Sequence, residues 1–360
     1  MRPALAAIAF GVVLVVAGGL FDAEPLFVGG VALPVLAVGA LAWVRLAAAG
    51  ASIDREVGAL RIVEDEPLSV RIDVRAPLPL PGGAIDDELL PGAVAIRGGA
   101  RRSRLRIEVR FDRRGRRHLS PPVLTVADPL GLARREVVGG DVAEVLVLPR
   151  TEPVRAPAGG KPRAGGRRRA MVESAADADI DGLRAYRLGA PASRIHWPAL
   201  ARGAGLLERR MRPDADSRPL VLLDARGGTP DALDAAVRAA ASLCLELARA
   251  GGCAVALPGD RRATQVEREL GAWAGVWARL AVVEPGGGPP GRNLAGRTGP
   301  VLYVAPAWSA RIGRALAHAS GTPIVVLPAG ARETGGGRPA FEVAGCRGYA
   351  LSRAARAAVA

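Results

Sequence analysis

The sequence predicts three structural parts: an N-terminal transmembrane helical hairpin, an all-β sandwich-like domain and a doubly wound α/β domain. Two apolar stretches without charge open the chain, at residues 4–20 and 26–44. Residues 52–150 contain runs that alternate apolar and polar side chains, and from Arg218 short apolar strands alternate with helical segments. We therefore divide the chain into residues 1–50, 51–150 and 213–360, with two connecting segments described below.

The first fifty residues are predicted to be a two-helix membrane anchor. Each apolar stretch is close to the roughly 17–25 residues that a helix needs to cross a bilayer. Arg2 precedes the first stretch, and Arg45, Arg55 and Arg61 follow the second. The positive-inside rule then places both ends in the cytoplasm and the turn at residues 21–25 outside. This predicts a two-pass protein of the inner (plasma) membrane with cytoplasmic soluble domains.

A cleaved signal peptide is the alternative interpretation of the first stretch. Only one arginine precedes that stretch, and a second apolar stretch follows it at once. Both features favour the hairpin.

Residues 51–150 are predicted to fold as an antiparallel sandwich. Residues 70–75 and 104–111 alternate apolar with charged side chains, which is typical of strands with one buried and one solvated face. Turns rich in proline, glycine or arginine interrupt these runs at residues 77–83 and 113–117.

The last part of the chain is predicted to alternate strands and helices, which implies a mainly parallel, doubly wound sheet. A flexible basic linker, residues 151–178, precedes it. Trp273 and Trp277 share one face of the second expected helix. The expected strands are residues 220–223, 254–257, 301–304 and 324–327, and the expected helices are residues 229–250, 264–280 and 309–320.

Composition sets broad limits. Hydrophobic residues make up 49% of the 360 residues, enough for two or three domains. The formal net charge is +14, and Lys161 is the single lysine beside many arginines. GC-rich coding explains this composition as well as nucleic-acid binding does. Cys244, Cys253 and Cys346 fit neither a disulfide framework nor a zinc site, which favours reduced thiols and a cytoplasmic location.

An arginine cluster lies at residues 97–117, with ten arginines and two acids. The first interpretation is a solvated face. The alternative is an electrostatic surface for anionic lipid or nucleic acid, of which lipid suits the chain better because aromatic residues are scarce in this stretch.

The segment at residues 179–212 concentrates glycine, arginine and aromatic residues. Its arginines are fork-shaped donors for carboxylates or phosphates, and its tyrosine and tryptophan offer flat apolar surface with a polar tip. These side chains either hold the segment against the α/β domain or form a partner-binding surface. His196 is expected to be structural, and we predict no catalytic residue and no cofactor. The candidates are Gly182, Arg184, Tyr186, Gly189, Arg194, His196, Trp197 and Arg202.

This segment resembles the core motif of the bacterial domain of unknown function family 58. The matching positions are Ile180, Gly182-Leu183-Arg184, Tyr186, Gly189, Arg194-Ile195-His196-Trp197, Ala201-Arg202, Leu206 and Arg209. Arg114-Gly115 and residues 128–132, Asp-Pro-Leu-Gly-Leu, also resemble the family, so the resemblance covers nearly the whole chain. The chain departs from the family pattern at Ala190, Pro191 and Ser193.

The resemblance implies a von Willebrand factor A-like α/β domain. The metal site of such domains uses Asp-x-Ser-x-Ser, but here Asp224 is followed by Ala225, Arg226, Gly227 and Gly228. Asp224 is therefore the remnant of a degenerate metal site that we expect to be empty, with Arg226 able to pair with it.

The resemblance also implies a function. It implies a non-enzymatic scaffold or adaptor that partners a MoxR-type AAA ATPase in the assembly or maturation of envelope-associated proteins. Binding of anionic lipid or nucleic acid through the arginine cluster is the alternative from another functional class.

Overall fold

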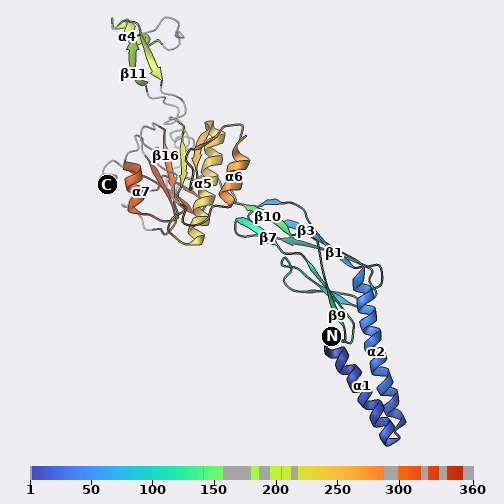
Figure 1. The fold of residues 1–360 in the computed structure, drawn as a ribbon. Helices are drawn as coiled ribbons and strands as arrows, with labels where there is room; N and C mark the ends of the chain where they lie inside the picture. The colour runs from blue at the N-terminus through green and yellow to red at the C-terminus, as the bar shows by residue number, and fades with distance from the viewer. Residues whose placement is uncertain are drawn as a thin grey trace. The chain divides into compact units, whose positions relative to one another are not determined.

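The computed structural model describes residues 2–140, 142–156, 180–185, 195–203, 205–211, 218–287, 299–317, 323–331 and 339–351. The chain divides into two compact units (Figure 1). Unit 1 comprises Met1–Asp112 and Arg116–Val147, and unit 2 comprises Arg113–Gly115 and Leu148–Ala360. Most of the predicted linker, residues 157–178, lies outside the described residues.

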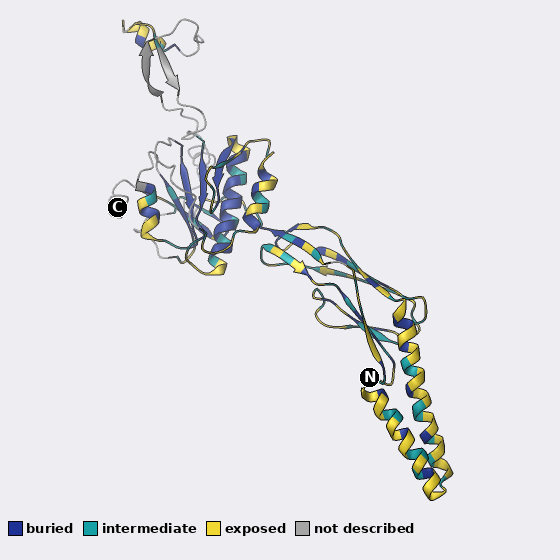
Figure 2. Cartoon of the chain, viewed as in Figure 1, coloured by how far each residue is buried: buried dark blue, intermediate teal, exposed yellow. Residues whose placement is uncertain are grey.

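The chain opens with two apolar helices, α1 (Arg2–Phe21) and α2 (Glu24–Ala49), each long and apolar enough to cross a membrane. They pack where small residues allow close approach: a Cβ on Gly11 would lie 2.5 Å from Cδ of Pro34. Their large apolar side chains are mostly exposed (Figure 2). The buried positions recur every seven residues, at Ala4, Gly11 and Gly18 in α1 and at Gly30, Ala37 and Val44 in α2.

Unit 1 continues as a β-rich domain of three sheets, and the pairing is antiparallel in the first and third of those described next. One sheet has the order β1 (Ser52–Val57), β3 (Leu68–Arg75), β6 (Arg102–Val109). A second has the order β2 (Arg61–Val63), β10 (Ala143–Leu148), β7 (Gly115–Leu119). A third has the order β5 (Val94–Ile96), β4 (Gly83–Asp86), β8 (Val123–Ala127), β9 (Arg134–Val138).

The alternation in the sequence correctly predicted the buried face of these strands. Val70 pairs with Ile107 and Ile72 with Leu105 in the register of β3 and β6. These side chains join a hydrophobic core to which all three sheets contribute. The last turns of α2 enter the same core through Val44 and neighbouring alanines, so the two helices and the β-rich domain are one unit.

A buried ion pair lies inside the β-rich domain. Arg55 Nη1 is 2.8 Å from Asp87 Oδ2, and the two side chains are 2% and 0% exposed. Arg55 also donates to the carbonyl of Leu119, and Asp87 accepts the amide of Leu89. These hydrogen bonds offset part of the cost of removing two charges from water.

Unit 2 contains a seven-stranded mixed sheet in the order β15-β14-β13-β16-β17-β19-β18. Its four central strands are parallel: β14 (Cys253–Ala256), β13 (Leu220–Leu223), β16 (Val301–Val304) and β17 (Ile324–Pro328). The outer strands are antiparallel: β15 (Thr264–Val266), β19 (Cys346–Ala350) and β18 (Phe341–Val343).

Helices pack on both faces of this sheet, as expected for a doubly wound domain. α5 (Pro230–Gly251) and α6 (Trp273–Ala281) share a core with one face, and α7 (Ala310–Ala317) shares a core with the other. Thr229 caps α5 by accepting the amide of Ala232, and Trp273 and Trp277 stack with ring centroids 5.6 Å apart.

The predicted helix at residues 264–280 is wrong in its first half. Thr264–Val266 forms β15, which pairs with the edge of β14, and the helix begins only at Trp273. Leu270 has φ +60° in the turn between them, which breaks a continuous helix. The antiparallel strands β18 and β19 were not predicted either.

We predict that Asp87→Ala destabilises the β-rich domain by about 3–5 kcal/mol, because Arg55 remains buried without its partner. The measurement is hydrogen exchange of the β1 amides in the detergent-solubilised chain. Glu136→Ala is the control, since its partner Arg134 and Glu136 itself are 68% and 54% exposed. The loss of stability in this control variant should stay below about 1 kcal/mol. Equal losses in the two variants would contradict the role given to Asp87.

Candidate functional site

The motif segment forms a small two-stranded sheet with a short helix. β11 (Ile180–Ala185) pairs antiparallel with β12 (Leu207–Met211), and α4 (Trp197–Ala201) lies between them in sequence. Gly182 and Arg184 lie in β11, and Arg184 stands opposite Glu208 in the register. The register is irregular between Ile180 and Leu183, where Gly182 sits.

His196 has a capping role at the start of α4. Its Nδ1 accepts the amide of Ala199 at 3.2 Å, which satisfies one of the free donors at the helix N-terminus. Its own backbone amide donates to the carbonyl of Leu207 at 2.8 Å. His196 therefore links α4 to β12, and its Nδ1 lone pair is engaged by the backbone.

Trp197 presents its ring to solvent. The residue is 58% exposed although it is the first residue of a capped helix, and Arg202 at the other end of α4 is also exposed. This exposure does not fit a side chain that is buried to hold the segment in place, and it leaves a large aromatic surface available for a partner. The candidates Tyr186, Gly189 and Arg194 lie outside the described residues.

The second candidate position, Asp224, directly follows β13 and is 2% exposed. Arg226 binds it with two side-chain nitrogens, Nε to Oδ1 at 3.1 Å and Nη2 to Oδ2 at 3.2 Å. The backbone amide of Arg226 also donates to Oδ1, and the hydroxyl of Tyr303 donates to Oδ2 at 2.7 Å. The expected pairing of Arg226 with Asp224 is present.

The electrostatics of this cluster favour a fixed charge state. The hydrogen bond with Asp224 raises the pKa of Arg226. Burial, followed by the hydrogen bond to Asp224, raises the pKa of Tyr303, so its hydroxyl stays protonated and acts as the donor. Asp224 thus faces one permanent cation and one neutral hydroxyl.

The residues present do not fit a divalent cation at Asp224. Such ions need several converging oxygens, whereas both oxygens of Asp224 are already bonded to protein donors. The two serine positions of the metal motif are occupied by Arg226 and by Gly228, and Gly228 has φ +76°, a conformation in which a serine would be strained. Elsewhere in the described parts of the chain, no group of three or more His, Cys, Asp or Glu residues is arranged to hold a metal ion.

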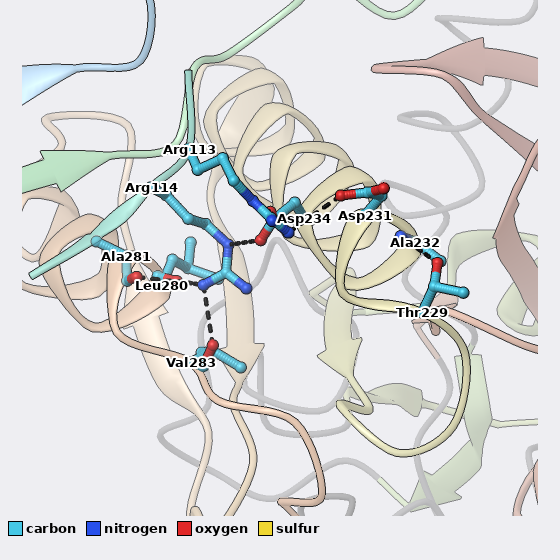
Figure 3. A network of polar contacts seen from close by, with 9 residues as sticks. All are labelled: Arg113, Arg114, Thr229, Asp231, Ala232, Asp234, Leu280, Ala281 and Val283. Atoms are coloured by element: carbon cyan, nitrogen blue, oxygen red, sulfur yellow. Dashed lines mark hydrogen bonds and ion pairs between the residues drawn. The ribbon is translucent and has the colours of Figure 1, made fainter. Parts of the chain in front are cut away.

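A third polar cluster, around Asp234 in α5, was not predicted (Figure 3). Arg114 Nε is 3.0 Å from Asp234 Oδ1, and Arg113 Nη2 is 3.0 Å from both Asp234 Oδ2 and Asp231 Oδ1. The guanidinium of Arg114, whose side chain is 5% exposed, also donates to carbonyls at the end of α6. The accepting carbonyls belong to Leu280, Ala281 and Val283.

This cluster corrects the interpretation of residues 97–117 as one solvated face. Arg102, Arg104 and Arg106 in β6 are exposed, but Arg114 is buried and belongs to unit 2. Acids also neutralise part of the exposed face. A hydrogen bond from Arg71 lowers the pKa of Asp73 to about 2, and Arg104 binds the same carboxylate.

One sequence signal could have found Asp234, and a weaker one Tyr303. Asp234 lies beside Leu233 and one turn before Val237, so it is a charge at the apolar stripe of a predicted helix. Such a charge needs a partner when buried. Tyr303 is the one residue with a polar side-chain group in the apolar run of β16. This strand pairs with β13, which ends directly before Asp224.

Comparisons with known proteins leave the family open. No protein-family model matches this chain, and no curated protein matches it.

We predict that magnesium and manganese do not bind at Asp224. Arg226 opposes a divalent ion by Coulomb repulsion and already occupies the carboxylate. Calorimetric titration of the purified chain, beside the Asp224→Ala variant, measures this. Saturable sub-millimolar binding that Asp224→Ala abolishes would show that the site is functional.

We also predict that Asp234→Ala lowers the stability of unit 2 by about 3–5 kcal/mol, because Arg114 would keep a buried charge without its carboxylate. Asp231→Ala is the matched control: Asp231 also binds Arg113, but its side chain is 89% exposed, so the loss should be at most about 1 kcal/mol. Urea unfolding followed by near-ultraviolet circular dichroism measures both. Similar losses would contradict a buried charge at Arg114.

Proposed function

We propose that the chain is a non-enzymatic, membrane-anchored scaffold or adaptor that partners a MoxR-type AAA ATPase. In this proposal α1 and α2 form a two-pass anchor in the inner (plasma) membrane, and both units lie in the cytoplasm. The client process is the assembly or maturation of envelope-associated proteins.

The anchor is supported by the length and the surface of the two helices. Large apolar side chains such as Leu20 and Val28 are 76% and 73% exposed, which suits lipid better than water. Arg2 at one end and Arg45 near the other follow the positive-inside pattern for two cytoplasmic ends.

The single observation that carries the adaptor role is the exposed ring of Trp197 on a helix fixed by the His196 cap. Exposed tryptophans presented on ordered elements are typical energetic centres of protein interfaces. The motif that contains Trp197 resembles that of domain of unknown function family 58, which supports the ATPase as the partner. The pairing of Asp224 with Arg226 supports a von Willebrand A-like unit that works without an ion.

We predict that a MoxR-type AAA ATPase co-purifies with the full-length chain from native membranes and is lost with Trp197→Ala. The free energy of unfolding should change by no more than about 0.5 kcal/mol in this variant, because the removed side chain is mostly exposed. Mass spectrometry of the captured proteins and a melting curve of each variant provide the two measurements.

Leu60→Ala is the control, since Leu60 is also well exposed, at 63%, and lies in unit 1. Capture should be unaffected by it. The proposal is contradicted if no AAA ATPase is captured by the unsubstituted chain, or if Trp197→Ala captures it equally well.

The second candidate function is binding of anionic lipid or nucleic acid through β6. The exposed arginines at positions 102, 104 and 106 share one face of this edge strand, which favours it. Glu108 in the same row and Asp73 opposite Arg104 weaken it. Contacts with phosphate weaken steeply as the salt concentration rises. Binding of anionic lipid or nucleic acid to the chain that is present at low salt and lost at moderate salt would therefore favour this second function.

A further inference from the structure

The β-rich domain contacts α2 at a depth where the helix is still crossing the bilayer. A helix needs about 20 residues to cross a hydrocarbon core of about 30 Å. Counted from Glu24, that length ends close to Trp43. Ala40 and Leu41 are nevertheless packed against the β-rich core, and Val44 is fully buried in it. The domain therefore follows the membrane helix without a spacer and rests at the bilayer surface.

The β8–β9 hairpin is the part of the domain that extends along α2. Both strands pack against this helix, and β9 runs alongside its end (Figure 1). The open end of the hairpin lies beside β1, because a Cβ on Gly139 would be 2.5 Å from the carbonyl oxygen of Ile53. The turn therefore points back along α2.

Strand lengths give the depth of the turn. From Pro122 to Leu130 an extended chain covers about 26 Å at about 3.3 Å per residue. From Ala49 back to Ala40 the helix covers about 14 Å at 1.5 Å per residue. Even with an inclined hairpin, the turn reaches the level of Ala40, which agrees with the burial of Ala133 in the same core.

The turn itself, residues 128–133, is held by hydrogen bonds to Asp128 and carries an exposed leucine. Asp128 is buried, and its carboxylate accepts the amides of Leu130, at 3.0 Å, and of Ala133. Gly131, with φ +71°, donates to the carbonyl of Asp128. The backbone polar groups of the turn are thus engaged, yet the side chain of Leu130 is 64% exposed at its tip.

A second loop places another exposed leucine beside the C-terminal part of α2. The indole of Trp43 donates to the carbonyl of Pro79 at 3.1 Å, which holds the loop containing Leu78 against α2. Leu78 is 41% exposed. Tryptophan favours the membrane–water interface, so the loop that Trp43 holds is expected near that level.

We propose that Leu78 and Leu130 insert into the headgroup–acyl boundary of the bilayer that holds α1 and α2. The partner of this surface is the lipid itself, and the exposed Arg135 beside the turn suits anionic headgroups. The inference rests on the proposed membrane location of the helices. It adds that the β-rich domain is a peripheral membrane domain as well as the extension of an anchor.

The test uses the full chain in vesicles of phosphatidylcholine and phosphatidylglycerol. Single cysteines replace Leu130, Leu78, Leu60 or Val35 and receive an environment-sensitive fluorophore. The three native cysteines are free and buried, so the unsubstituted chain serves as the labelling blank. Lipids with a spin label high on the acyl chain act as quenchers. Leu60 and Val35 match Leu130 in exposure, at 63% each.

We expect emission at shorter wavelength and strong quenching for Leu130→Cys and Leu78→Cys. Leu60→Cys should show neither, because Leu60 lies beyond the far end of β1, about 20 Å from α2 at the usual strand rise. Val35→Cys reports the anchor and should be quenched, more strongly by spin labels placed deeper on the acyl chain.

Each other outcome overturns the inference in a distinguishable way. Quenching at Val35→Cys without quenching at Leu130→Cys leaves the anchor intact and removes the lipid contact. No quenching at Val35→Cys removes the proposed membrane location itself. Equal quenching at Leu60→Cys means non-specific adsorption, and a shift to shorter wavelength without quenching means that protein covers the leucines.

Discussion

The guanidinium of Arg114 is the constraint around which the helical layer of unit 2 is arranged. It is buried, it cannot lose its charge, and its compensation comes from two different helices. α5 supplies the carboxylate of Asp234, and the end of α6 supplies the carbonyls of Leu280 and its neighbours. Those carbonyls lie at the C-terminal end of α6, which carries the negative end of its dipole and therefore favours a nearby cation. One side chain therefore links the two helices that cover the same sheet face.

Arginine is used inside both units in the same way. Arg55 pairs with Asp87 in the β-rich core, and Arg226 pairs with Asp224 at the edge of the parallel sheet. In each case the planar fork binds a carboxylate and a further group lies within reach, which a lysine could not reproduce. The arginine content of this chain is thus partly an interior property, so the number of arginines overstates the number of cations on its surface. The net charge of +14 is unaffected, because each of these interior arginines is paired with a carboxylate.

Local patterns predicted much of the fold, and non-local pairing explains the rest. Alternation fixes which face of β3 and β6 is buried, because each strand's own residues determine it. The strand β15 depends on pairing with the edge of β14, which lies outside the stretch 264–280 that was predicted to be helical. At the candidate sites, too, contacts between residues close in sequence could be predicted and contacts between distant residues could not. Arg226 is two residues from Asp224, so their pairing could be anticipated, whereas Arg114 and Asp234 are far apart in sequence and no spacing reports their contact.

The pairing at Asp224 has a consequence for how this edge of the sheet responds to its surroundings. A dissolved ion occupies a site according to its concentration, but Arg226 is tethered two residues from the carboxylate, at an effective concentration that dilution cannot change. If no divalent ion binds there, as predicted above, a chelator leaves this edge unchanged and its charge does not follow the supply of divalent ions. Any surface built on this loop therefore carries its own cation, which is supplied by the chain and not by the solution.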